Sequence, residues 1–227
     1  MLQGAAFIET NDSTSLKSEK TRRQLFRTYI EALRRLSARQ LELVCAGVLS
    51  LTGAKFPTVT RYSADRGVDF FGQLPLAAFF LENQSFPGWQ MQMEAWMVGQ
   101  AKHYVDGTVS TPALRDLIGS VSMLRSPKAD RRAYPNLIIR TCDSVFHLLV
   151  TTGRLSSEVW REIDNHGAIG IDGEMLAAFL AARGVASSTS GFDESKFNEW
   201  LSTFEKFPVV IANDEDEDGM NGEVPTT

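Results

Sequence analysis

The chain has 227 residues, of which 43% are hydrophobic and 22% charged, a composition typical of a globular protein rather than a disordered one. This length allows one substantial domain with added helices and excludes two full-sized domains. No apolar run is long enough to span a bilayer, and the amino terminus lacks the basic start and apolar core of a signal peptide. We therefore expect a cytoplasmic protein with no membrane contact.

The net charge of −5 is unevenly distributed. Residues 17–39 hold eight Lys or Arg side chains against two Glu, whereas residues 214–218 are all acidic. A basic helix in the first segment would attract a phosphate backbone, and a solvated helix face or a subunit contact explains the pattern equally well. The acidic residues from about 213 onward are typical of a disordered tail. Cys45 and Cys142 lack metal-ligand spacing, and we expect both to be reduced core residues.

The first half of the chain predicts helices and then a hairpin. One basic helix is expected over about 16–35. Ser37 and Gln40 have the spacing of a capping box, which starts a second helix that ends near Gly53. Strands are expected at about 58–62 and 68–71, joined by a tight connection at 64–67. The aromatic-rich stretch 73–94 fits a sheet extension, a lid or a dimer surface.

A further apolar strand ends at residues 100–102, where Gln100 and Lys102 are two positions apart and so share one face of the strand. If this strand pairs beside residues 68–70, then Asp69, Gln100 and Lys102 converge at one point. A carboxylate, an amide carbonyl and an ammonium group in that arrangement would hold a divalent cation and a phosphate together.

After residue 104, helices and strands alternate. We predict helices at 111–124, 156–165, 174–183 and 193–204, and strands at 144–151 and 168–171. A second basic patch occupies 125–140, and His147 in the apolar strand is expected to be a core residue. The fold class is therefore α/β, with a mixed central β-sheet flanked by helices. The expected organisation is a loose amino terminus and basic helix (1–35), the main domain (36–186), a carboxyl-terminal helix (187–212) and the acidic tail (213–227).

Four sequence blocks, in order, resemble the Mrr-like restriction endonucleases, a branch of the PD-(D/E)XK nuclease superfamily. The blocks are Leu41-Glu42-Leu43-Val44, Ser63-Ala64-Asp65-Arg66-Gly67-Val68-Asp69, Gln100-Ala101-Lys102, and a closing block over 149–156 and 171–176. Each block alone is weak, but the four in order are specific. The resemblance covers about residues 36–185. Two departures are a long connection from Asp69 to Gln100 and the lack of a separate DNA-reading domain within the sequence.

The resemblance implies a restriction-endonuclease-like core and a metal-dependent DNA endonuclease, serving restriction or phage defence. Asp69, Gln100 and Glu42 would bind Mg²⁺, for which Mn²⁺ can substitute. Lys102 would position the attacking water and stabilise the negative charge that develops on the phosphate. Because Gln100 stands where many members of the superfamily have an acid, metal affinity should fall and a single-metal mechanism is favoured.

DNA is the expected partner, and the candidate contacts to it are Arg22, Arg23, Arg27, His103, Arg131 and Arg132. Cleavage of both strands implies a homodimer or association with a recognition partner, and a dependence on modified bases follows only from the family. A catalytically weak DNA-binding or structural subunit of a defence complex is the main alternative. A nuclease acting on RNA or branched DNA is a third. A nuclease would need Lys102, whereas a binding subunit would depend on the arginines of the basic helix.

Overall fold

A mixed five-stranded sheet forms the centre of the fold. The structure is a computed structural model, and it describes residues 7–60, 67–76, 93–126, 134, 136–188 and 191–205. The strand order is β1-β2-β3-β5-β7, made by β1 (Lys55–Val59), β2 (Phe70–Pro75), β3 (Glu94–Lys102), β5 (Ser144–Thr151) and β7 (Ile169–Ile171). The first three strands pair antiparallel, and β3, β5 and β7 pair parallel. The predicted hairpin and the predicted α/β class with a mixed sheet are thereby confirmed.

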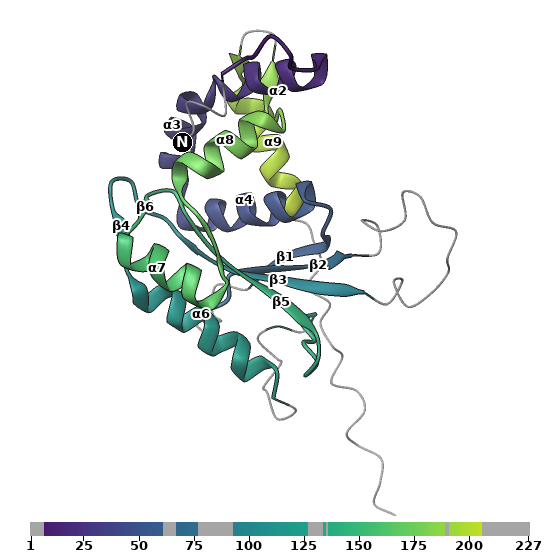
Figure 1. The fold of residues 1–227 in the computed structure, drawn as a ribbon, viewed down its shortest axis with the longest axis vertical. Helices are drawn as coiled ribbons and strands as arrows, with labels where there is room; N and C mark the ends of the chain where they lie inside the picture. The colour runs from purple at the N-terminus through teal and green to yellow at the C-terminus, as the bar shows by residue number, and fades with distance from the viewer. Residues whose placement is uncertain are drawn as a thin grey trace, which may run out of the picture.

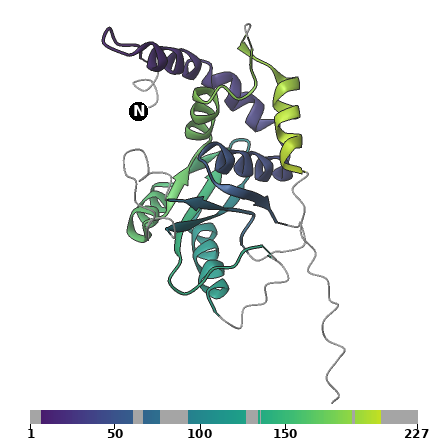
Figure 2. The ribbon, with the colours of Figure 1, turned by 90° about the vertical axis from the view of Figure 1, so that its right-hand side faces the viewer.

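Helices cover both faces of this sheet (Figure 1). On one face α4 (Ala38–Leu51) lies against the strands, with α3 (Phe26–Arg34), α8 (Gly173–Ala182) and α9 (Glu194–Glu205) packed in the same core. On the other face lie α6 (Thr111–Leu124) and α7 (Ser157–His166). A further helix, α2 (Thr14–Arg23), packs beside α8, and the views of Figures 1 and 2 place α2 and α6 at opposite ends of the molecule.

Two short strand pairs complete the described structure. The parallel pair is β4 (Thr108–Val109) with β6 (Arg154–Leu155), and the antiparallel pair is β8 (Ser187–Ser188) with β9 (Gly191–Phe192). The pairing of β4 with β6 ties the segment after β3 to the segment after β5. No helix in the described ranges is long and apolar enough to cross a membrane.

Alternation along β3 decides which helices its side chains meet. Met97 packs in the core beneath α4, and Val98 packs in the core formed with α6. Continuing the alternation, Ala101 packs against the α4 core, and Gln100 reaches a carbonyl group of α6. The end of β3 therefore presents Gln100 and Lys102 on the α6 side, as their spacing predicted.

Local signals set several helix ends as predicted. Ser37 and Gln40 form the capping box of α4: Ser37 Oγ accepts from Gln40 N at 3.2 Å, and Gln40 Oε1 accepts from Ser37 N at 2.9 Å. Gly53 follows this helix with a φ of 90°, and Gly167 ends α7 with a φ of 64°, both in the left-handed region that favours glycine. The helix predicted at 111–124 has the observed bounds of α6.

Two expectations are wrong. The single basic helix over 16–35 is two helices, because Leu25 adopts a φ of −81° and a ψ of 0° and its N–H donates to Arg22 O, three residues back. Tyr29 and Leu33 of α3 are buried, whereas α2 buries no residue, so a change of direction lets α3 alone enter the core. The second error concerns Cys142, which is exposed, while Cys45 is buried as predicted.

Other expectations fall partly outside the described residues. The stretch 73–94 extends the sheet at its two ends, since β2 continues to Pro75 and β3 begins at Glu94. Its central part (77–92), the predicted tight connection at 64–66 and the acidic tail lie outside the described ranges. His147 is half-buried in β5, close to the core position expected of it.

Candidate active site

Asp69 lies immediately before β2, at the edge of the sheet where β2 and β3 begin to pair. Its Oδ2 accepts a hydrogen bond from Ala101 N at 2.8 Å, and its own N–H donates to Gly99 O at 2.9 Å. The carboxylate is therefore held on the main chain of β3 between Gln100 and Lys102. The structure thus places Asp69 on the main chain of β3 between the other two residues of the predicted site, whose joint action stays a prediction.

Gln100 is a buried polar residue, only 5% exposed. In the amide orientation that satisfies both neighbours, Nε2 donates to Ala113 O at 2.8 Å and Oε1 accepts from Lys102 Nζ at 3.2 Å. Ala113 lies in the first turn of α6, so this helix fixes which way the amide points. As a result the carbonyl oxygen of Gln100, rather than its NH₂ group, faces Lys102.

Two buried threonines hold the end of β3 in place. Thr151 pairs with Lys102 in the parallel register, and its Oγ1 donates to Lys102 O at 2.7 Å. Thr152 Oγ1 accepts from Tyr104 N at 2.9 Å and donates to Tyr104 O at 3.0 Å. Neither threonine was predicted to have a role at the site. The available signal was a pair of hydroxyl side chains closing an otherwise apolar strand, since buried hydroxyls need partners.

Glu42 lies in the second turn of α4. Its Oε2 accepts from Arg39 Nη1 at 2.7 Å, and the same nitrogen donates to Thr60 O at 2.7 Å. Burial raises the pKa of Glu42 above its usual range; the hydrogen bond and charge of Arg39 oppose this shift, and the charge of Asp69 adds to it. Glu42 and Asp69 therefore act on each other electrostatically. Arg39 was not among the predicted site residues, although its spacing of three from Glu42 on a helix was a usable signal.

A buried thiol adds no charge to this site. Burial raises the pKa of Cys45 well above its usual range, and the charges of Asp69 and Glu42 act in the same direction. The thiol is thus protonated at neutral pH, and it packs in the hydrophobic core between α4 and the sheet.

The oxygen donors at this site fit a hard, partly hydrated cation. Among the residues that the structure describes, no three His, Cys, Asp or Glu side chains gather in a way that would hold a metal. The two carboxylates Asp69 and Glu42 are instead near enough for their charges to interact, and Asp69 binds the main chain of β3 next to Gln100. Mg²⁺ prefers such oxygen ligands and keeps several of its waters, so this small donor set suits it.

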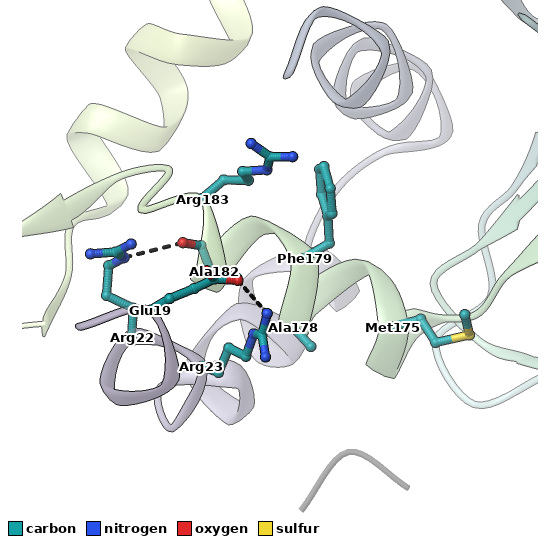
Figure 3. Close-up of a pocket in the computed structure, with 8 residues that line it drawn as sticks. All are labelled: Glu19, Arg22, Arg23, Met175, Ala178, Phe179, Ala182 and Arg183. Atoms are coloured by element: carbon teal, nitrogen blue, oxygen red, sulfur yellow. Dashed lines mark hydrogen bonds and ion pairs between the residues drawn. The ribbon is translucent and has the colours of Figure 1, made fainter. Parts of the chain in front are cut away.

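Two of the arginines predicted to bind DNA lie away from this site. Arg22 Nε donates to Ala182 O at 3.1 Å and its Nη1 to Ser18 Oγ at 2.9 Å, while Arg23 forms an ion pair with Glu19. Together they line a pocket between α2 and α8 (Figure 3). Ala182 is the last residue of α8, whereas Gly173 at the start of α8 donates its N–H to Gly153 O near the end of β5. The ten-residue helix, about 15 Å long, separates the two regions.

The remaining predicted DNA contacts differ in their surroundings. Arg27 is exposed on α3. His103 is half-buried, and its Nε2 is buried with no hydrogen-bond partner among the described residues. Arg131 and Arg132 fall outside the described ranges. DNA contact by any of these residues stays a prediction.

The mixed sheet with helices on both faces is similar to the folds of restriction endonucleases. The comparison with protein families agrees, since residues 33–134 match the Mrr catalytic-domain family, described as a restriction endonuclease. Within residues 33–134, the chain is therefore similar to the catalytic domain of the Mrr-like restriction endonucleases. The match includes the first three sequence blocks of the predicted resemblance; the closing block lies beyond it.

Two solved structures are similar to the chain. One is the MspJI restriction endonuclease in complex with a 27-mer oligonucleotide, at 20% identity and a TM-score of 0.49, covering 88% of this chain and 40% of that one. The other is the DNA modification-dependent restriction endonuclease AspBHI, at 20% identity and a TM-score of 0.48, covering 80% of this chain. The present chain spans 40% of the length of each. No curated protein matched the chain.

Proposed function

We propose that the chain is a metal-dependent endonuclease that hydrolyses DNA phosphodiester bonds, acting in restriction. The observation that carries this proposal is the position of the Asp69 carboxylate on Ala101 N, between Gln100 and Lys102, inside a segment of restriction-endonuclease sequence. An acid, a carbonyl oxygen and an ammonium group are the groups that metal-dependent phosphodiester hydrolysis needs.

Each residue has a distinct task in this proposal. Asp69, Glu42 and the Oε1 of Gln100 would hold Mg²⁺ or Mn²⁺. When bound, such a cation neutralises charge on a phosphoryl oxygen and lowers the pKa of a water molecule. Lys102, whose Nζ lies 3.2 Å from Gln100 Oε1, would orient the attacking water and stabilise the extra negative charge on the phosphate. Thr151 would keep Lys102 in place through the main chain.

DNA as the substrate is part of the same proposal. Cleavage of both strands requires two sites, so the proposal includes a homodimer or a transient pairing on DNA, or a partner protein that selects the target. A dependence on modified bases comes from the sequence resemblance alone. Among the predicted contacts, exposed Arg27 presents its charge to solvent, as contact with a phosphate backbone requires.

A second candidate function is a catalytically weak DNA-binding subunit. The observation that favours it is the weak donor set: Gln100 is neutral, and one oxygen of Glu42 is bound by Arg39. Such a subunit would hold DNA inside a larger assembly and would tolerate the loss of Lys102.

The test is cleavage of supercoiled plasmid DNA, methylated and unmethylated, in Mg²⁺ or Mn²⁺. Asp69→Asn keeps an acceptor for Ala101 N while removing the charge, and Lys102→Met keeps the length of the side chain. Each should lower the cleavage rate by about 100-fold or more. Lys55→Met, at an exposed position on β1, is the matched control and should cleave like the wild type.

The outcomes separate the two candidate functions. Metal-dependent nicking by the wild type and the control, absent from the two site variants, would support the nuclease. If all four proteins were folded and bound DNA but none cleaved it, the binding subunit would replace it.

A further inference from the structure

Arg39 forms an ion pair with Glu42, one of the two carboxylates of the candidate site. One nitrogen, Nη1, donates to both Glu42 Oε2 and Thr60 O, each at 2.7 Å. This nitrogen carries two hydrogens, so both are used by these two contacts. The Arg39 side chain is 42% exposed and that of Glu42 only 16%, so Glu42 is the more buried partner of this ion pair.

Thr60 connects this contact to Asp69. Its N–H donates to Asp69 O at 2.9 Å, and its Oγ1 donates to Val68 O at 3.0 Å. Arg39 thus joins the start of α4 to the main chain that carries Asp69. A guanidinium in this position reduces the net charge of the two carboxylates from −2 to −1, which weakens their attraction for any second cation.

We propose that Arg39 is a positioning residue that competes with the divalent cation for Glu42 and thereby limits metal binding at the site. This inference rests on the proposed function, because it takes Asp69 and Glu42 as metal-binding groups. Glu42 can give its Oε2 either to Arg39 or to a metal. The protein therefore binds metal less tightly than its two carboxylates alone would allow.

The opposite result is expected of a purely structural arginine. If Arg39 only held α4 against Thr60, its removal would loosen the site and weaken metal binding. If it competes for Glu42, its removal should tighten metal binding even though the protein loses a contact. The direction of the change in metal affinity therefore separates the two roles.

The experiment is a titration of the full-length protein with Mn²⁺, without DNA, in which the electron paramagnetic resonance signal of free Mn²⁺ reports binding. The variants are Arg39→Gln, which removes the charge, and Arg39→Lys, which keeps it. We expect Arg39→Gln to bind Mn²⁺ about tenfold more tightly than the wild type, a typical coupling between two ligands that compete for one group. Arg39→Lys should stay within about twofold, because an ammonium remains beside Glu42.

Two controls complete the design. Arg35→Gln removes an arginine of the same region whose ion pair with Glu194, at 3.5 Å, is exposed, and its Mn²⁺ affinity should equal that of the wild type. Asp69→Asn should abolish the binding and so locates the Mn²⁺ at the site. Circular dichroism confirms that each variant is folded.

Either result for Arg39→Gln decides the inference. Unchanged or weaker Mn²⁺ binding would overturn it, while metal-dependent cleavage by the wild type would leave the proposed nuclease standing. If neither the wild type nor Arg39→Gln bound Mn²⁺ and the wild type cleaved no DNA, the proposed function itself would fail.

Discussion

Replacing Gln100 by glutamate should destabilise the folded protein while raising its affinity for a divalent cation. Glutamate has the same size, but it offers an oxygen where Gln100 Nε2 now donates to Ala113 O at 2.8 Å. The loss of this bond costs about 1 kcal/mol, and two facing oxygens in a site only 5% exposed add about 1–2 kcal/mol. The ammonium of Lys102 offsets about 1 kcal/mol of this. The expected net loss is about 1–2 kcal/mol at pH 7.

The sign of the pH dependence gives a second check. When the introduced carboxyl takes up a proton, it can donate to Ala113 O as the amide did. Its pKa in the folded state is thus raised above the unfolded value near 4.3, and the destabilisation should vanish as the pH falls below that value. Urea unfolding of the wild type and Gln100→Glu, at pH 7 and pH 4, measures both effects.

A matched control makes the same chemical change at a solvated position. Gln40→Glu retains the carbonyl oxygen that caps α4, so its stability should lie within about 0.5 kcal/mol of the wild type. The reasoning is refuted if Gln100→Glu is as stable as the wild type at pH 7, or if its deficit grows on acidification. Mn²⁺ titration should show tighter binding by Gln100→Glu, since it adds an anionic oxygen donor.

Two further predictions concern stability. Gly99→Ala would place a methyl group against the ring of buried Phe70, and it should lower the free energy of unfolding by about 1–3 kcal/mol. Gly119→Ala, on an exposed face of α6 with open space around it, should instead raise the free energy of unfolding by about 0.5–1 kcal/mol. Equal thermal shifts for the two variants would contradict the packing argument. Burial lowers the pKa of His147, and the charges of Arg125 and His166 lower it further. The unfolded chain therefore binds a proton at His147 more readily than the folded chain, so the free energy of unfolding should fall as the pH drops below about 6.5. In urea melts between pH 7 and pH 5, His147→Gln should lose less stability than the wild type, and an equal loss in the two proteins would contradict this prediction.

Helix ends and strand pairs were predictable to different degrees. The bounds of α6 and the capping box of α4 follow from residues within one helical turn, and local sequence is sufficient for them. The break between α2 and α3 has no such signal, because it arises where Tyr29 and Leu33 enter a core shared with α8, about 150 residues further along the chain. The parallel pairing of β3 with β5 likewise depends on the packing of α6 between them in sequence, which periodicity alone does not reveal.

The candidate site divides in the same way. The positions of Asp69, Gln100 and Lys102 were predictable because β2 and β3 were expected to pair and the spacing of Gln100 and Lys102 places both on one face of β3. Arg39 and Thr151 were not, although both hold a site residue in place. Each donates to a main-chain carbonyl, and because every residue carries one, the sequence does not show which carbonyl is the acceptor.

This use of main-chain acceptors explains how the site tolerates a neutral Gln100. Gln100 donates to Ala113 O, Arg39 to Thr60 O, and Thr151 to Lys102 O, so α6, the end of β1 and the end of β3 each fix one side chain. The geometry is thus set by the backbone path, while the charge is set by Asp69, Glu42, Lys102 and Arg39. Arg39 offsets the charge of Glu42, and the ammonium of Lys102 contacts the amide oxygen of Gln100. An extra acid at position 100 would shift the charge of the site toward tight metal binding, and it would do so at the expense of the contact that orients the residue.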